Sequence, residues 1–379
     1  MLFTYLLFMS VLFEIGINSK FKGYMSIIII SFIFTTSYGM GTDWMNYQPY
    51  YENINEPIFK FEFGFQKING LFSRAGFSYQ LFSGVIIFIC IFIVLNFIRK
   101  KSYNYYIGFI FIIMYSILTM SLEPLLRQFI ALGVVIYSQR FIEKRNFFLY
   151  LIFIIIASLF HSSALVCLGF YFFSKLKIDI KLFLICLLLG NLILDNIEIF
   201  LKNIGNIIPL FSKYAVYIFK YGNGSIISNP LILIMKKSKF FIIALLLDYL
   251  YKKNNKRNIL IYNGGLLFLM FATFVYNIPI IARFNHYFTP YYAICISNIS
   301  KIIDNKKSKI LSAGVAVIYG LYLLVGFVKY NYFDEVNKQR YLEYKNYFIE
   351  YFTNDDKMDY DTKMEKYGNK IIKILNNNK

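Results

Sequence analysis

Long apolar runs separated by short basic clusters limit the fold of this chain more than any other feature. Runs such as 79–98 and 147–173 contain no Asp, Glu, Lys or Arg and reach the roughly 20 residues that a helix needs to cross a bilayer. A buried strand needs only about 4–8 apolar residues. Charged residues make up 16% of the chain, too few to cover a soluble domain. The sequence therefore predicts an all-α polytopic integral membrane protein.

The basic clusters predict the direction of each span, because lysines and arginines in short loops stay cytoplasmic. The number of crossings between successive basic clusters agrees with this rule if residues 147–173 cross the membrane twice and turn near "FHSSA". Only Lys236, Lys237 and Lys239 do not fit, at the outer end of a short span. The pattern predicts about 11–12 crossings with both chain ends outside. The apolar runs are 1–17 (expected to be retained), 24–40, 79–98, 105–122, 125–141, 147–173, 182–201, 238–251, 259–281, 287–300 and 310–328.

The domain organisation follows from these runs. Residues 1–328 are expected to form one transmembrane domain, with outer-face loops at 41–78 and 202–237. Residues 329–379 are expected to form a charged, tyrosine-rich tail. We find no internal repeat and no separate soluble domain.

Several function classes are disfavoured by composition and motif. The net charge of +19 comes mainly from loops between spans, and no basic-aromatic stripe predicts nucleic-acid binding. The four cysteines lie in apolar runs without metal-ligand spacing, so we expect no metal and no cofactor. "HSSA" lacks the nucleophile-elbow pattern of a serine hydrolase.

Polar residues converge at one predicted face of the membrane. Arg127, His161, Arg283 and His286 all fall near the outer ends of spans. An ionisable group inside the hydrocarbon costs about 2–4 kcal/mol on insertion scales, so it usually faces a partner or a polar cavity. Four such groups at one level predict an outward-facing cationic pocket.

Each of these residues also has a structural interpretation. Arg127 has Glu123 four residues before it, the spacing of a helical ion pair. His161 fits an interfacial histidine, Arg283 a side chain that snorkels to the headgroups, and His286 with Tyr287 an aromatic belt. The convergence of all four favours the functional interpretation.

Five segments resemble EpsG-family and Wzy-type (O-antigen) polysaccharide polymerases in order and spacing. They are "GTDWMNYQPYY", "FEFGFQKINGLFSRAG", "LRQFIALGVVIYS", "ASLFHSSAL" and "RFNHYF", and the resemblance covers most of residues 24–300. Family members often carry an arginine shortly before "GTD", where this chain has "TTSYGM", so the role of that arginine is absent or supplied elsewhere. The resemblance implies a GT-C-like membrane glycosyltransferase in the bacterial cytoplasmic (inner) membrane, with its active site facing the periplasm or exterior.

The resemblance also implies a reaction. The donor is a glycan on undecaprenyl pyrophosphate and the acceptor is one lipid-linked repeat unit. The acceptor hydroxyl attacks the anomeric carbon of the donor, and the lipid pyrophosphate leaves. The product is O-antigen, capsule or exopolysaccharide. Expected partners are the bilayer, these lipid-linked glycans and a protein that regulates chain length.

This chemistry assigns roles to candidate residues. Guanidinium groups match phosphate geometry and stay charged, and the chain has no convincing DxD-type carboxylate cluster, so we expect a metal-independent enzyme. A histidine or carboxylate is needed to accept the hydroxyl proton. The candidates are Arg127, Arg283, His286, Lys236 and Lys237 for pyrophosphate, His161, Asp43 and Glu62 for the base, and Trp44, Tyr47, Tyr50 and Tyr51 for sugar stacking in a lid formed by loop 41–78.

Two alternative functions stay open. A flippase or transporter for lipid-linked oligosaccharide is disfavoured, because the centres of the predicted spans are nearly free of charge. An O-antigen ligase or an acyltransferase would act at the same face, and a ligase would use the same donor and a similar pocket.

Overall fold

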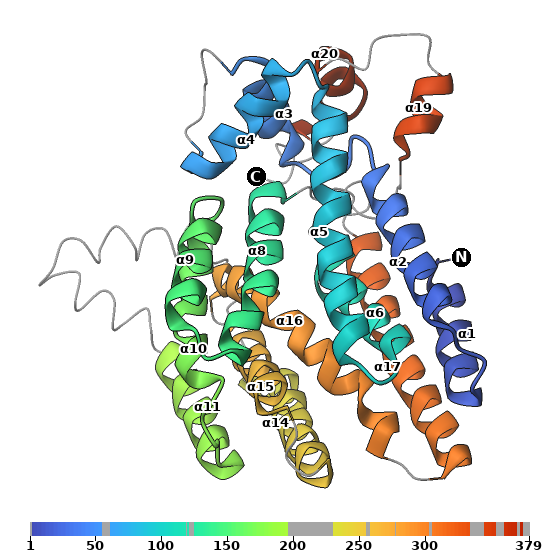
Figure 1. Cartoon of the computed structure of the whole chain (residues 1–379), viewed down its shortest axis with the longest axis vertical. Helices are drawn as coiled ribbons and strands as arrows, with labels where there is room; N and C mark the ends of the chain where they lie inside the picture. The colour runs from blue at the N-terminus through green and yellow to red at the C-terminus, as the bar shows by residue number, and fades with distance from the viewer. Residues whose placement is uncertain are drawn as a thin grey trace, which may run out of the picture.

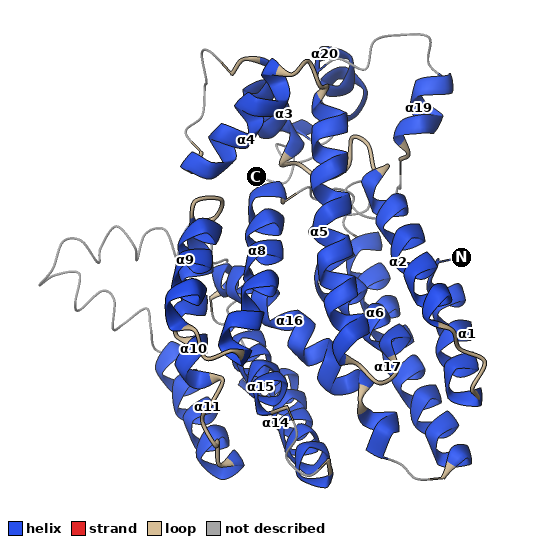
Figure 2. Cartoon of the chain, viewed as in Figure 1, coloured by secondary structure: helices blue, strands red, loops and turns tan. Residues whose placement is uncertain are grey.

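The computed structural model describes residues 2–54, 61–118, 120, 125–195, 230–254, 258–276, 278–302, 305–333, 345–353, 360–369 and 372–373. These residues are almost entirely helical, and their one strand-like feature is an isolated bridge between Ser37 and Asn346 (Figure 2). The all-α prediction is therefore confirmed for the part of the chain that is described. The helices are α1 (Leu2–Ile15), α2 (Lys20–Thr35), α3 (Trp44–Glu52), α4 (Phe63–Arg74), α5 (Tyr79–Lys101), α6 (Tyr105–Ile112), η1 (Ile113–Ile117), α8 (Leu126–Glu143), α9 (Phe147–Ser158), η2 (Ser162–Leu168), α10 (Phe170–Phe173), α11 (Ile180–Asp195), α14 (Pro230–Lys253), α15 (Ile259–Phe274), η3 (Pro279–Ile281), α16 (Ala282–Ser297), η4 (Ile299–Ile302), α17 (Lys306–Tyr332), α19 (Tyr347–Thr353), α20 (Tyr360–Lys363) and η6 (Met364–Gly368).

The long helices run along the long axis of the molecule (Figure 1). The short helices α3, α4, α19 and α20 gather at one end, which we call the loop end. Basic residues mark the opposite end, which we call the basic end: α5 ends in Arg99–Lys101, α14 ends in Lys252 and Lys253, and α17 begins at Lys306. This separation agrees with the orientation predicted from the basic clusters.

Residues 147–173 fold back on themselves, as predicted. Helix α9 ends at Ser158, and η2 begins at Ser162 after a turn that contains His161. The Tyr150 hydroxyl donates to the carbonyl oxygen of Cys167 at 2.5 Å, and the rings of Phe147 and Tyr171 lie 5.0 Å apart. A single helix would separate those two rings by about 36 Å, at 1.5 Å per residue. The turn near "FHSSA" is therefore confirmed.

The predicted spans differ in length from the observed helices. Two described helices, Tyr79–Lys101 and Lys306–Gly326, are long and apolar enough to cross a bilayer, and six more apolar helices are shorter. The break before η2 interrupts the run 147–173, which the sequence presents as continuous, and a π-helical turn, η1, follows α6 within the run 105–122. The number of crossings and the GT-C-like arrangement therefore stay predictions.

Two boundaries are corrected. Loop 202–237 was expected to end where a span begins at residue 238, but α14 already begins at Pro230. Lys236 and Lys237 therefore belong to a helix rather than to a loop; residues 202–229 lie outside the described residues. The tail was expected from residue 329, but α17 continues to Tyr332.

Glycine allows close packing of α15 against α16. Helices α15 and α16 share the most extensive contact in the described bundle. A Cβ at Gly264 would lie 2.5 Å from the ring of Tyr291, closer than real Cβ contacts allow. One turn further along α15, Phe268 stacks on Tyr292 with the ring centroids 4.2 Å apart. This pairing fixes α16, whose first two turns carry Arg283 and His286.

Candidate active site

Arg127 lies in the first turn of α8 and binds two residues of loop 41–78. Its Nη1 lies 2.6 Å from Glu62 Oε2, and its Nε donates to the Tyr47 hydroxyl at 3.1 Å. The guanidinium is also 4.9 Å from the centre of the Phe61 ring. The ion pair is only about one-quarter exposed on either side. Arg127 therefore pairs with Glu62 from the loop; Glu123, the helical alternative, lies outside the described residues.

Helix α4 is held against the α9–η2 turn, and this backbone contact positions Glu62 beside Arg127. The backbone N–H of Gly64 donates to the carbonyl oxygen of Leu159 at 2.8 Å. A Cβ at position 64 would lie 2.9 Å from that same oxygen, so only glycine allows this approach. Glu62 is the residue before α4 begins and makes no capping bond, which leaves its carboxylate for Arg127. Residues 62–65, "EFGF", thus combine a charge with a close backbone contact.

Tyr47 links Arg127 to Asp43. Its hydroxyl donates to Asp43 Oδ2 at 3.3 Å while it accepts from Arg127. Burial raises the pKa of Tyr47 above its ordinary value, and the charge of Asp43 raises it further, so the hydroxyl stays protonated. Asp43, Tyr47, Arg127 and Glu62 therefore form one chain of polar contacts that joins the loop to α8.

His161 begins a second polar chain at the α9–η2 turn. Its Nδ1 accepts from the backbone N–H of Ser163 at 3.3 Å and lies 2.6 Å from Ser163 Oγ, which is 2.9 Å from the Tyr287 hydroxyl. Because Nδ1 accepts, we assign the proton of the neutral ring to Nε2. In this arrangement His161 offers a hydrogen-bond donor at Nε2 rather than a free lone pair. That geometry fits an anion better than it fits the role of general base.

Two further predicted pyrophosphate ligands, Arg283 and His286, lie on α16. The carbonyl oxygen of Arg283 accepts from Gln128, the neighbour of Arg127, at 2.6 Å, and this bond ties the start of α16 to α8. The exposed Arg283 side chain and Arg127 both lie within electrostatic range of His161. His286 turns toward η1, with its Nδ1 3.1 Å from Ser116 Oγ. The structure therefore brings Arg127, His161 and Arg283 together around Glu62 and places His286 at the edge of the group.

The two lysine candidates belong to α14. Lys237 is buried on α14, whose main contacts are with α15 and α11. The side chain of Lys236 lies outside the described residues. Among the described residues, no group of three or more His, Cys, Asp or Glu side chains is placed to hold a metal ion.

The aromatic residues of the loop are packed rather than open. Trp44, Tyr47, Tyr50 and Tyr51 are each at most 3% exposed. Tyr51 stacks on Phe82 at 5.1 Å and donates to the carbonyl oxygen of Phe77 at 2.8 Å. These rings form a small core between α3, α4 and α5, and their faces are covered in this arrangement. Sugar stacking therefore stays a prediction that requires the loop to open.

The tail supplies a residue that the sequence analysis missed. Lys363 of α20 is fully buried, with its Nζ 4.3 Å from the Trp44 ring, 4.6 Å from the Tyr38 ring and 5.5 Å from the Tyr79 ring. Its Nζ also donates to Gln48 Oε1 at 3.2 Å. Burial, the largest cause, lowers the pKa of Lys363 to about 7; Lys345 lowers it further and Glu52 opposes the shift. Nothing in the local sequence marks this lysine, because its partners are more than 280 residues away.

A second anchor holds the tail to the same end of the molecule. The backbone N–H of Tyr347 donates to the Thr36 carbonyl oxygen at 2.7 Å, and that of Tyr38 donates to the Lys345 carbonyl oxygen at 3.0 Å. The described parts of the tail therefore pack beside loop 41–78, at the loop end.

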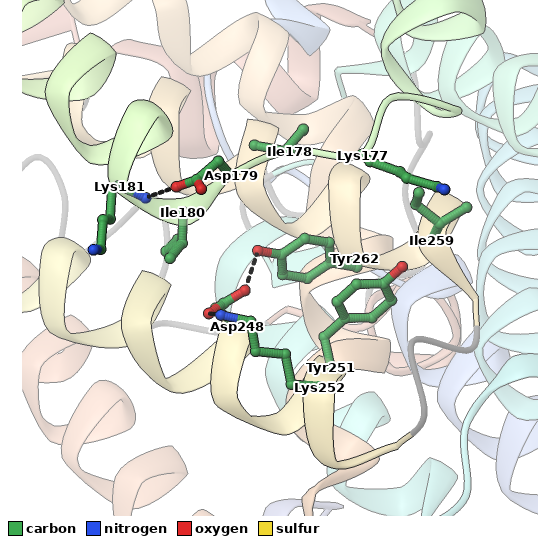
Figure 3. A pocket seen from close by; sticks show the side chains of 10 residues that line it. All are labelled: Lys177, Ile178, Asp179, Ile180, Lys181, Asp248, Tyr251, Lys252, Ile259 and Tyr262. Atoms are coloured by element: carbon green, nitrogen blue, oxygen red, sulfur yellow. Dashed lines mark hydrogen bonds and ion pairs between the residues drawn. The ribbon is translucent and has the colours of Figure 1, made fainter.

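A cavity of about 550 Å³ lies elsewhere, at the basic end, between the start of α11, the end of α14 and the start of α15 (Figure 3). None of the predicted site residues lines it. It therefore plays no part in the candidate active site.

Comparison with known proteins gives one match. The model of the EpsG family matches residues 20–346, which includes the loop, α8, the α9–η2 turn and α16. No curated protein and no solved structure matches the chain.

Proposed function

Because the chain belongs to the EpsG family, we propose that it is a polytopic membrane glycosyltransferase that polymerises lipid-linked oligosaccharide repeat units. It would act in the bacterial cytoplasmic membrane, with the loop end facing the exterior and the basic end facing the cytoplasm. The orientation is supported by the basic residues at the ends of α5 and α14 and at the start of α17.

The observation that carries the proposal is the ion pair between Arg127 and Glu62, which joins the cation expected to bind pyrophosphate to a candidate base. A lipid pyrophosphate carries at least two negative charges and offers the guanidinium a stronger partner than one carboxylate. When the donor substrate binds Arg127, the carboxylate of Glu62 is released from its partner. Substrate binding and activation of the base are therefore coupled.

The proposed step is a single displacement at the anomeric carbon of the donor sugar. The acceptor hydroxyl oxygen forms a bond to that carbon, and its proton passes to the Glu62 carboxylate. The bond from the carbon to the pyrophosphate oxygen breaks, and undecaprenyl pyrophosphate leaves with the electron pair. Arg127, the Nε2–H of His161 and Arg283 stabilise the charge that develops on the leaving oxygen. The reaction needs no metal to neutralise the pyrophosphate.

Arg127→Ala tests this proposal. Removal of one preorganised donor to a developing anion typically lowers the rate by about 10²–10³-fold. Cells that carry the variant should assemble surface glycan with one repeat unit per anchor, which is measured as a collapsed ladder on a gel. Arg140→Ala is the matched control, because Arg140 lies on the same helix but covers the ring of Tyr137 at 3.3 Å.

A ladder of normal length from a stable Arg127→Ala protein would contradict the proposal. Complete loss of surface glycan on deletion of the gene would favour a flippase or a ligase instead. A change in the length distribution alone would indicate a partner that regulates chain length rather than the polymerase itself.

A further inference from the structure

The cavity at the basic end has charged side chains that the proposed reaction does not use. Its volume is about 550 Å³, and it opens between the first turn of α11, the last turn of α14 and the first turn of α15. Figure 3 shows Lys177 and Lys181 on two sides of it, with Asp248, Tyr251, Lys252 and Tyr262 between them. The cavity is therefore a basic pocket between helices.

The two carboxylates of the cavity are already satisfied within the protein. Asp248 accepts from the Tyr262 hydroxyl at 3.1 Å and pairs with Lys252 at 2.6 Å. Asp179 accepts from the backbone N–H of Lys181 at 2.7 Å, so it caps the start of α11. Neither carboxylate pairs with the ammonium group of Lys177 or Lys181.

Lys177 and Lys181 are the two cationic side chains of the cavity that form no ion pair with its carboxylates. Among the described residues, neither ammonium group forms an ion pair or a hydrogen bond. Both lie at the N-terminal end of α11, a helix of 16 residues whose dipole adds partial positive charge there. Lys177, Lys181 and Lys252 outnumber Asp179 and Asp248 among the lining residues, so the cavity has a net charge of one positive unit.

The surroundings of the cavity indicate what kind of anion it takes. Tyr251 and Tyr262 stack face to face, 4.2 Å apart and nearly parallel, and form one flat wall. Beside the cavity, Leu176, Leu182 and Tyr249 point outward and are more than half exposed. A basic pocket with an apolar outer surface, at the cytoplasmic ends of membrane helices, is the chemistry that binds phosphate headgroups.

We propose that this cavity binds the phosphate headgroup of an anionic phospholipid of the cytoplasmic leaflet, with Lys177 at one edge of the cavity and Lys181 at the opposite edge as its cationic contacts. The proposal requires the chain to lie in a membrane but does not depend on the polymerase reaction. A soluble phosphate compound has the same recognition chemistry, and the experiment distinguishes the two sources.

The test uses the full-length protein in detergent, with lipid binding measured by native mass spectrometry. Phosphatidylglycerol is titrated against phosphatidylcholine. We expect wild-type protein to prefer phosphatidylglycerol, and Lys177→Ala/Lys181→Ala to weaken that binding by about tenfold or more. Lys177→Arg/Lys181→Arg should keep it. Lys100→Ala/Lys144→Ala is the matched control, because it removes the same charge from exposed residues outside the cavity.

Equal losses in the cavity and control variants would overturn the proposal, because they would indicate a general effect of surface charge. An equal affinity for the two lipids would also overturn it. Competition by millimolar inorganic phosphate would keep the phosphate site but assign it to a soluble ligand. Arg127→Ala should bind lipid normally, so failure of the proposed reaction and failure of this site can be told apart.

Discussion

The two ends of the molecule use ionic side chains in opposite ways. At the loop end, Arg127 and Lys363 are each held by residues far away in the sequence and are largely buried. At the basic end, Lys177 and Lys181 have no anionic partner among the described residues, and the ion pair between Lys101 and Glu143 is more exposed than that of Arg127. Charge therefore maintains a specific geometry at the loop end, whereas at the basic end we propose that it sets orientation and binds lipid headgroups.

The same substitution made at both ends should give the greatest contrast in activity. Glu62 and Glu143 each lie 2.6 Å from a cation. Glu62→Gln removes the proposed base and should lower the rate of polymerisation by about 10²–10⁴-fold. Glu143→Gln should leave the rate unchanged and lower the free energy of unfolding by at most about 1 kcal/mol, because exposed pairs contribute little. The measurements are glycan ladder length and thermal unfolding; similar effects at the two sites would remove the functional distinction between the ends.

A more moderate change should follow from disturbing the backbone contact that places Glu62. In Gly64→Ala, the new Cβ meets a backbone oxygen at 2.9 Å and forces α4 away from the α9–η2 turn. We expect a loss of about 1–3 kcal/mol in stability, as for other overpacked sites, together with reduced polymerisation. Gly70→Ala is the control on the same helix, because nothing lies within 4 Å of a Cβ added at that position, and it should be neutral or slightly stabilising. Equal behaviour of the two variants would show that the close approach does not place the carboxylate.

Much of the fold was predictable from the sequence because it follows from local patterns. The apolar runs predicted helices, and the basic clusters predicted which helix ends lie together at one end of the bundle. The polar segment "FHSSA" predicted a turn, which the hydrogen bond between Tyr150 and Cys167 confirms. Helix lengths were less predictable. A hydropathy pattern contains neither the π-helical turn at Ile113–Ile117 nor the early start of α14 at Pro230, where proline favours the first position of a helix.

The site shows the same limit. The candidate residues around Arg127 were found because they share a predicted membrane face, but the partner of Arg127 was not, since Glu62 lies 65 residues away. The aromatic residues of the loop, predicted to stack on sugars, are packed in a core in this structure, so sugar stacking stays a prediction. Composition cannot separate these outcomes, because buried and ligand-binding aromatic residues have the same spacing. The contact between Lys363 and Gln48 spans 315 residues and is visible only in three dimensions.

The smallest of the three effects is the pH dependence with which the tail helix α20 packs, through Lys363, against loop 41–78. It tests whether a buried cation distinguishes the loop end from the basic end. The pKa of Lys363 is about 7 when α20 is docked, against 10.5 for a free lysine. Between these values the undocked tail binds a proton that the docked tail does not, so docking strengthens as pH rises from about 7 to about 10, by up to tenfold per pH unit. Below about pH 7 both states are protonated and the dependence disappears.

Trp44 is the only tryptophan of the chain and contacts Lys363, so its fluorescence reports docking directly. On titration from pH 10 to pH 7, we expect the emission of wild-type protein to shift to longer wavelength as Trp44 becomes exposed. Lys363→Met keeps the packing but cannot titrate, and its emission should stay constant. Burial raises the pKa of the neighbouring Tyr47, so that hydroxyl does not titrate in this range. A pH-dependent shift that persists in Lys363→Met would assign the titration to another group and leave this lysine as a packing residue, no different in kind from the surface lysines of the basic end.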